Sequence, residues 1–273
     1  MTAPTSTTTS VTGRPTRTGT GHLNPRLVAA TAGRVLRQLR HDHRTIAMML
    51  VLPSVLLGLL YLLWKDVPTF PGQPSIFDRV GLTMLGILPF VVMFLVTSIA
   101  MLRERTSGTL ERLLTTPLAR LDLLLGYGAA FGLAAAAQAL VTVTIATTVY
   151  GLDVKGSIWL VVLIAVVDAI LGVALGLLAS AFARTEFQAV QFMPVIVLPQ
   201  FFLCGLLVPV DQMAGWLQAI AHVLPLTYAV EALQEVGRSA AATTTMWIDV
   251  GIVAGAALVA LALAAATLRR RTN

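Results

Sequence analysis

Residues 103–126 read RERTSGTLERLLTTPLARLDLLLG, a charged and helix-forming segment between two long apolar stretches. Segments that cross a hydrocarbon core are predominantly apolar, so this one must lie in water, against the membrane face or against a partner protein. The chain has no G-x-x-x-x-G-K-[ST] loop and no other phosphate-binding motif. A membrane protein with a docking segment and no nucleotide site of its own is expected to be one subunit of a powered assembly.

The composition predicts an all-α polytopic membrane protein. Of the 273 residues, 56% are hydrophobic and 12% charged, and the mean hydropathy is +0.82. A soluble domain carries about 25% charged residues. Residues 1–24 are rich in Thr, Ser, Pro, Gly and Arg, which predicts a disordered tail. We expect residues 25–273 to form one transmembrane domain. Cys204, the single cysteine, rules out an intrachain disulfide.

We expect six spans, each near the roughly 20 residues that a hydrocarbon core requires. They are Ile46–Trp64, Val80–Leu102, Leu123–Tyr150, Ser157–Ala183, Gln188–Pro209 and Met246–Leu268. With this arrangement, 15 of the 19 Lys and Arg residues lie on the side of the two termini. Because cytoplasmic loops are enriched in Lys and Arg, both termini and the 103–122 loop are predicted to be cytoplasmic.

A basic amphipathic helix is predicted before the first span, over Pro25–Arg44. Its apolar residues fall mostly on one stripe and its arginines lie off it or at its edge. Such a helix is expected to lie in the cytoplasmic headgroup plane. The alternative is that these arginines only mark the cytoplasmic side.

The 103–122 loop is predicted to contain a short amphipathic helix. Thr106 or Ser107, followed by Gly108, can start it, and Glu111 lies near its positive N-terminal end. Its apolar edge is formed by Leu110, Leu113 and Leu114, and Pro117 ends the helix. A loop lying on lipid is the alternative, and the residues alone leave both open.

The segment Val210–Val236 is too apolar for an ordinary outer loop. Met213, Trp216, Leu217 and Ile220 fall at helical spacing, and Pro225 starts a second short helix. We expect these helices to dip into the outer leaflet or cap a pathway, because non-helical backbone at that depth requires shielding by protein or water. Two helices lying flat on the membrane are the alternative.

Asp168 is the one charge well inside a predicted span. A central Asp costs roughly 2.5–3.5 kcal/mol on insertion scales, so it must face a polar cavity, a partner or the dimer seam, or be protonated. It either lines a transport pathway or makes a structural hydrogen bond, for example to Gln138. Further pathway candidates are Gln138, Gln191 and Gln200.

Three pairs of small residues four positions apart, Gly128–Gly132, Gly172–Gly176 and Gly251–Gly255, favour close helix packing within one protomer. The four histidines are not spaced with acidic residues as metal ligands, so we expect no metal site.

Two segments carry a resemblance to a known family. Residues 103–126 resemble the cytoplasmic loop of bacterial ABC-2-type exporter permeases, in particular the daunorubicin-resistance-like branch. Residues 198–236 resemble that family's fifth span and the segment after it: an apolar run, Gly205, Pro209, a short helix with Trp216, and a turn from Pro225 to Tyr228. The chain departs from many members in having Leu224 where an Asn is common, and Gln234 and Glu235 before a later Arg238.

The resemblance implies the transmembrane permease subunit of an ATP-binding-cassette exporter, not itself an enzyme, in a bacterial cell membrane. It implies a homodimer, or a pair with a similar permease, and two ATPase subunits that bind ATP and Mg, with no cofactor on this chain and no nucleic acid partner. The residues expected to couple to the ATPase are Ser107, Gly108, Leu110, Glu111, Arg112, Leu114 and Pro117. An ion-coupled secondary transporter and a membrane-embedded lipid-modifying enzyme are the alternatives.

Overall fold

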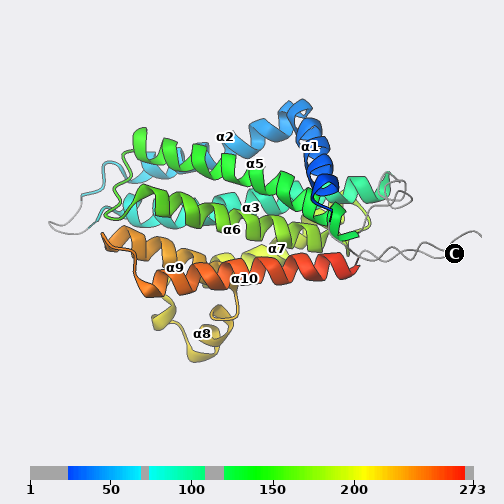
Figure 1. Cartoon of the computed structure of the whole chain (residues 1–273). Helices are drawn as coiled ribbons and strands as arrows, with labels where there is room; N and C mark the ends of the chain where they lie inside the picture. Colours follow the sequence, from blue (N-terminus) through cyan, green and yellow to red (C-terminus); the bar gives the residue numbers. More distant parts are fainter. Residues whose placement is uncertain (1–23, 69–73, 108–119, 268–273) are drawn as a thin grey trace, which may run out of the picture.

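The computed structural model describes residues 24–68, 74–107 and 120–267, and these contain helices but no strand (Figure 1). The helices are α1 (Pro25–His41), α2 (His43–Trp64), α3 (Ile76–Thr106), α5 (Arg120–Thr148), α6 (Ile158–Ala179), α7 (Glu186–Leu203), the 3-10 turn η1 (Val210–Gln212), α8 (Gly215–Ala221), α9 (Pro225–Arg238) and α10 (Thr244–Thr267). The predicted all-α class is confirmed.

In the part of the chain that the structure describes, six helices are long and apolar enough to cross a membrane: α2, α3, α5, α6, α7 and α10. They correspond in order to the six predicted spans. The second is longer than predicted: it begins at Ile76, because Ser75 and Asp78 form a capping box, and it continues to Thr106. The prediction that the fifth span reaches Pro209 is wrong, because α7 ends at Leu203. Gly205 then takes a φ of +87°, a conformation that glycine adopts readily and that a helix does not contain.

α3 is the central helix of the bundle and packs against α2, α5, α6, α7 and α9. Its approach to α6 depends on two glycines. A Cβ on Gly172 would lie 2.4 Å from the carbonyl oxygen of Phe90, and one on Gly176 would lie 2.6 Å from that of Phe94. The predicted role of this small-residue pair in packing within one protomer is therefore confirmed.

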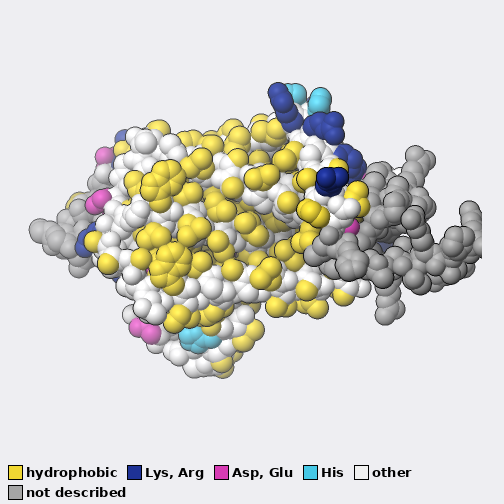
Figure 2. Space-filling model, in the orientation of Figure 1, with side chains coloured by type: hydrophobic (Ala, Val, Ile, Leu, Met, Phe, Trp, Pro, Cys, Tyr) yellow, Lys and Arg dark blue, Asp and Glu magenta, His cyan; other side chains and the backbone are white. Residues whose placement is uncertain are grey.

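α1 lies across one end of the bundle, roughly perpendicular to the long helices (Figure 1). Thr31, Ala32 and Val35 are buried, and Thr31 contacts α5 at Gly126. Lys and Arg side chains gather at this end, and hydrophobic side chains cover the visible flank (Figure 2). The predicted amphipathic helix is confirmed as a helix. We call this the α1 end of the bundle; it also holds the last turn of α3 and the first turn of α5 (Figure 1).

The two short helices expected between the fifth and sixth spans are α8 and α9. α8 stands away from the bundle (Figure 1), and its Trp216 side chain is exposed. α9 begins at Pro225 and packs against α3, α6 and α10, with one face buried. Tyr228 supports the turn between the two helices by donating a hydrogen bond to the His222 carbonyl (2.7 Å). Pro209 is the N-cap of η1 and not part of a span.

Candidate functional site at the end of α3

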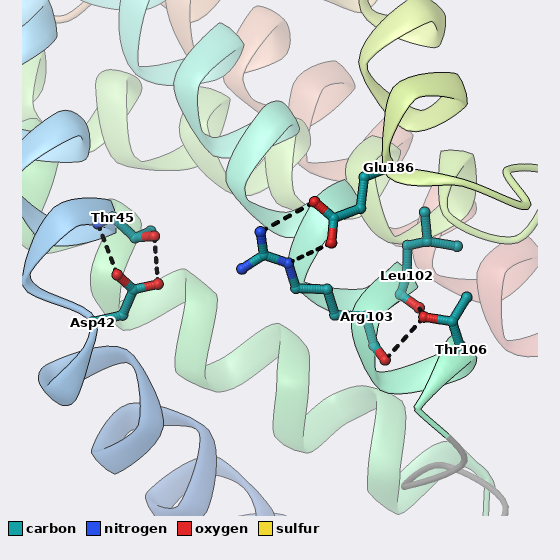
Figure 3. Close-up of polar contacts among 6 residues, drawn as sticks. All are labelled: Asp42, Thr45, Leu102, Arg103, Thr106 and Glu186. Atoms are coloured by element: carbon teal, nitrogen blue, oxygen red, sulfur yellow. Dashed lines mark hydrogen bonds and ion pairs between the residues drawn. The ribbon is translucent and has the colours of Figure 1, made fainter.

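Arg103 ties the last turn of α3 to the first turn of α7. Its Nε donates to Glu186 Oε1 at 2.8 Å and one terminal nitrogen donates to Oε2 at 3.1 Å (Figure 3). The two side chains meet in a paired, planar geometry that fixes their mutual orientation. Both side chains are more than half exposed. The pair therefore orients the ends of α3 and α7 but adds little to the stability of the fold.

The next residue, Glu104, ties the same turn of α3 to α1. Its carboxylate pairs with Arg34 at 3.4 Å, and only 8% of the Glu104 side chain is exposed. Arg34 also donates a hydrogen bond to the Tyr127 hydroxyl of α5 and lies over that ring. A buried carboxylate left without its partner costs several kcal/mol, on the order of 3–5. Removing Arg34 should therefore destabilise the protein more than removing one partner of the exposed Arg103–Glu186 pair.

α3 ends immediately after this pair of contacts. The Thr106 hydroxyl donates to the carbonyls of Leu102 (3.1 Å) and Arg103 (3.3 Å), which closes the last turn (Figure 3). Ser107 is the C-cap of α3. Of the two residues predicted to start the next helix, Thr106 is instead the last residue of α3, and the predicted helix after Ser107 lies outside the described residues. The other predicted coupling residues lie outside the described residues: Gly108, Leu110, Glu111, Arg112, Leu114 and Pro117.

Asp42 forms the corner between α1 and α2. Its carboxylate accepts hydrogen bonds from the Thr45 backbone nitrogen (3.1 Å) and the Thr45 hydroxyl (2.7 Å), which caps α2 (Figure 3). These hydrogen bonds, chiefly that of the Thr45 hydroxyl, lower the pKa of Asp42 below its ordinary value of 3.8, and the charge of Arg103 lowers it further. The Asp42 carboxylate is therefore ionised at neutral pH.

Asp168 lies on α6, fully buried, with a carboxylate oxygen directed toward Gly86 of α3. Within the described residues neither its carboxylate nor the equally buried Gln138 amide makes a hydrogen bond. The suggested bond between them is therefore not formed. Gln200 is buried and its oxygen accepts from the Leu226 backbone nitrogen (3.4 Å), which joins α7 to α9. Gln191 is exposed on α7. Within the described residues no hydrogen bond joins any two of the four.

The ion pairs at the α1 end were not foreseen from the sequence. Arg34 and Glu104 are 70 positions apart, and Arg103 and Glu186 are 83 apart. One local indication was present in the sequence: Glu104 and Glu186 are acidic residues at the ends of apolar spans. An acidic residue in such a place indicates a basic partner at the same depth in the membrane. No group of three or more His, Cys, Asp or Glu side chains that could hold a metal occurs in the part of the chain that the structure describes.

The chain is similar to several transport proteins. It is 27% identical to the "Probable multidrug ABC transporter permease YbhR" of Escherichia coli K12 over 60% of this chain and 45% of that protein. It is 28% identical to the "ABC transporter G family member 20" of Dictyostelium discoideum over 62% of this chain and 23% of that protein. It is 26% identical to the "Inner membrane transport permease YhhJ" of E. coli K12 over 67% of this chain and 46% of that protein.

The chain thus spans less than half the length of each of these relatives. The model of the ABC-2 type transporter family matches residues 26–236, from α1 to the end of α9. This region contains five of the six candidate spans and both ion pairs at the α1 end. The chain is a multi-pass membrane protein that belongs to the ABC-2 type transporter family.

Proposed function

We propose that this chain is the membrane subunit of an ATP-binding-cassette exporter. It pairs with a second copy or a similar permease, and ATP is hydrolysed with Mg on two separate ATPase subunits. The pair forms the pathway for an amphipathic substrate such as a drug, a secondary metabolite or a lipid. It lies in a bacterial inner membrane with both termini cytoplasmic, an orientation supported by the gathering of basic residues at the α1 end.

The observation that carries the proposal is the arrangement around the last turn of α3. Two consecutive residues, Arg103 and Glu104, join this turn to α7 on one side and to α1 on the other. The chain continues from this turn into the segment with Glu111 and Leu114, which we propose to contact the ATPase. A displacement of that segment would move α3, and the ion pairs would pass the movement to α1 and α7.

The proposed pairing with a second permease is supported by Gln191. This amide lies exposed on α7, a helix otherwise rich in exposed apolar side chains such as Phe187 and Val195. A polar group facing lipid has no hydrogen-bond partner, and polar residues within spans face protein or a water-filled cavity. We propose that this face of α7 borders the pathway between the two permeases. Gln200, whose oxygen accepts a hydrogen bond from the Leu226 backbone nitrogen, would then stabilise the packing that shapes it.

An ion-coupled secondary transporter remains the rival function, and the buried Asp168 favours it, since intramembrane carboxyl groups serve as proton relays. The two functions differ in what drives transport. An exporter of the proposed kind requires a partner ATPase and ATP, whereas an ion-coupled transporter works alone with an ion gradient.

Co-purification with an ATPase subunit tests the proposal. The tagged chain is purified from its native cells, the Walker-motif ATPase that co-purifies with it is identified by mass spectrometry, and the ratio of the two proteins is measured. Glu111→Ala should reduce the bound ATPase at least fivefold, because truncating one partner of a buried charge pair costs about 2–5 kcal/mol. Leu114→Ala should do the same, because the few residues that dominate an interface each contribute about 2 kcal/mol or more. Matched controls at the opposite end and in the outer segment are Asp66→Ala and Leu207→Ala, both at exposed positions. Equal retention of the ATPase by all four variants would contradict the assignment.

A further inference from the structure

A groove of about 450 Å³ lies beside α1, between the corner of α1 and α2 and the end of α3. Its walls come from α1, α2, α3 and α5, and Val190 of α7 lies at its border. Sites for small molecules have volumes of about 300–1,000 Å³. The groove therefore has room for one compact organic molecule.

The lining of the groove is amphipathic. The α3 wall runs from Val92 to Glu104, which is roughly 18 Å at the rise of an α-helix. Apolar side chains line it away from α1: Met48, Leu52, Val92, Leu95 and Val96. Near α1 the lining is mixed: Gln38, Asp42, Thr45, Arg103 and Glu104 are polar or charged, and Val35 and Leu39 of α1 itself are apolar. An occupant with one polar end and a long apolar body matches this division.

The charges at the polar end are not balanced. Arg103 is paired with Glu186, and Glu104 is paired with Arg34. Asp42 makes no ion pair within the described residues; its carboxylate accepts two hydrogen bonds from Thr45, and the backbone of Arg44 and the charge of Arg103 also stabilise its ionised form. In Figure 3 Asp42 and Arg103 lie on either side of the same space, and the guanidinium is turned to Glu186. Among the charged residues that line the groove, Asp42 is the one without an ion-pair partner in the described residues, and Arg103 is close enough to attract it.

We propose that this groove binds a lipophilic organic cation, with its cationic centre beside Asp42 and its apolar body against Leu52 and Leu95. The proposal rests on the proposed function in one respect: the groove would be where an exporter takes up such a substrate at the membrane depth of α1. Binding itself needs no ATPase, so it can be measured on the permease alone.

The probe is the tetraphenylphosphonium cation, and its control is the tetraphenylborate anion, which has nearly the same shape and the opposite charge. The full chain is placed in nanodiscs of neutral phosphatidylcholine, so that lipid charge does not select between the two ions. Binding is measured by equilibrium dialysis, and the uptake of empty nanodiscs is subtracted. We expect saturable binding of the cation and no saturable binding of the anion.

Two substitutions test the two ends of the groove. Asp42→Asn removes the charge but keeps a residue that caps a helix equally well; it should weaken cation binding about fivefold, as expected for a partly exposed ion pair. Leu52→Trp enlarges a side chain that is 42% exposed at the groove, and it should abolish binding without disturbing the core. The control for the charge is Asp66→Asn, at an exposed loop position. The control for the size is Leu59→Trp, at a position on α2 that is 53% exposed and does not line the groove.

Equal saturable binding of the cation and the anion, or unchanged binding by both Asp42→Asn and Leu52→Trp, would overturn the proposal. So would a phospholipid that co-purifies with the wild type and is lost only in Leu52→Trp, because it would assign the groove to lipid. A melting curve like that of the wild type shows that each variant is folded. If the cation does not bind but the ATPase complex is intact, the proposed binding site is refuted and the proposed function is not. If the cation binds but no ATPase complex forms, the proposed function is refuted and the proposed binding site is not.

Discussion

Gly172→Ala should destabilise the bundle by separating α3 from α6. The new Cβ would lie 2.4 Å from the Phe90 carbonyl oxygen, whereas ordinary contacts begin near 3.4 Å. The two backbones must therefore move apart by about 1 Å at their closest point, since a backbone carbonyl cannot swing away as a side chain can. Overpacking of this kind costs about 1–3 kcal/mol.

The assay is unfolding of the purified chain in mixed detergent micelles, followed by circular dichroism. Gly251→Ala is the matched control, because a Cβ there meets no atom within 4 Å. Both substitutions gain the same intrinsic preference of Ala for a helix, about 1 kcal/mol in water. Their difference therefore isolates the clash. If the free energy of unfolding of Gly172→Ala equals that of Gly251→Ala, the close contact of α3 and α6 does not exist as described.

Three further predictions follow from particular contacts. A double-mutant cycle of Arg103→Gln and Glu186→Gln should give a coupling energy of no more than about 1 kcal/mol in unfolding, because both side chains are exposed, whereas a value well above that would contradict their exposure. Asp168→Asn should leave the free energy of unfolding unchanged or raised, because the buried carboxylate has no hydrogen bond to lose in the described residues; a large loss would reveal an ion pair formed in the assembly. A cysteine placed at Ser107 should resist a membrane-impermeant thiol reagent in intact cells, whereas one placed at Asp153 should react, and the reverse pattern would invert the proposed orientation.

The spans and α1 could be predicted because their signals are local. A run of about 20 apolar residues reveals each span, and the regular spacing of apolar residues with arginines off the stripe reveals α1. The end of α7 could not, because the residues from Cys204 to Pro209 are as apolar as the helix before them. The turn there depends on the backbone of Gly205, which hydropathy does not register.

The candidate site was predictable only in part. The charged segment after α3 stands out in the sequence, but its residues from Gly108 to Ala119 lie outside the described structure. The ion pairs of Arg103 and Glu104 join helices that are far apart in the chain, so only the tertiary structure identifies their partners. A hydrogen bond between Asp168 and Gln138 was a reasonable expectation from polarity, but polarity alone does not say which way each side chain faces in a packed bundle.

ATP-driven transport in inside-out membrane vesicles tests the central claim most directly. Vesicles that contain this chain and its ATPase should accumulate a fluorescent lipophilic cation when ATP is added, and accumulation should persist after proton and sodium gradients are dissipated. Vesicles with either protein alone, or with an ATPase whose Walker lysine is replaced, should not accumulate it. Transport by this chain alone, driven by an ion gradient and indifferent to ATP, would contradict the account.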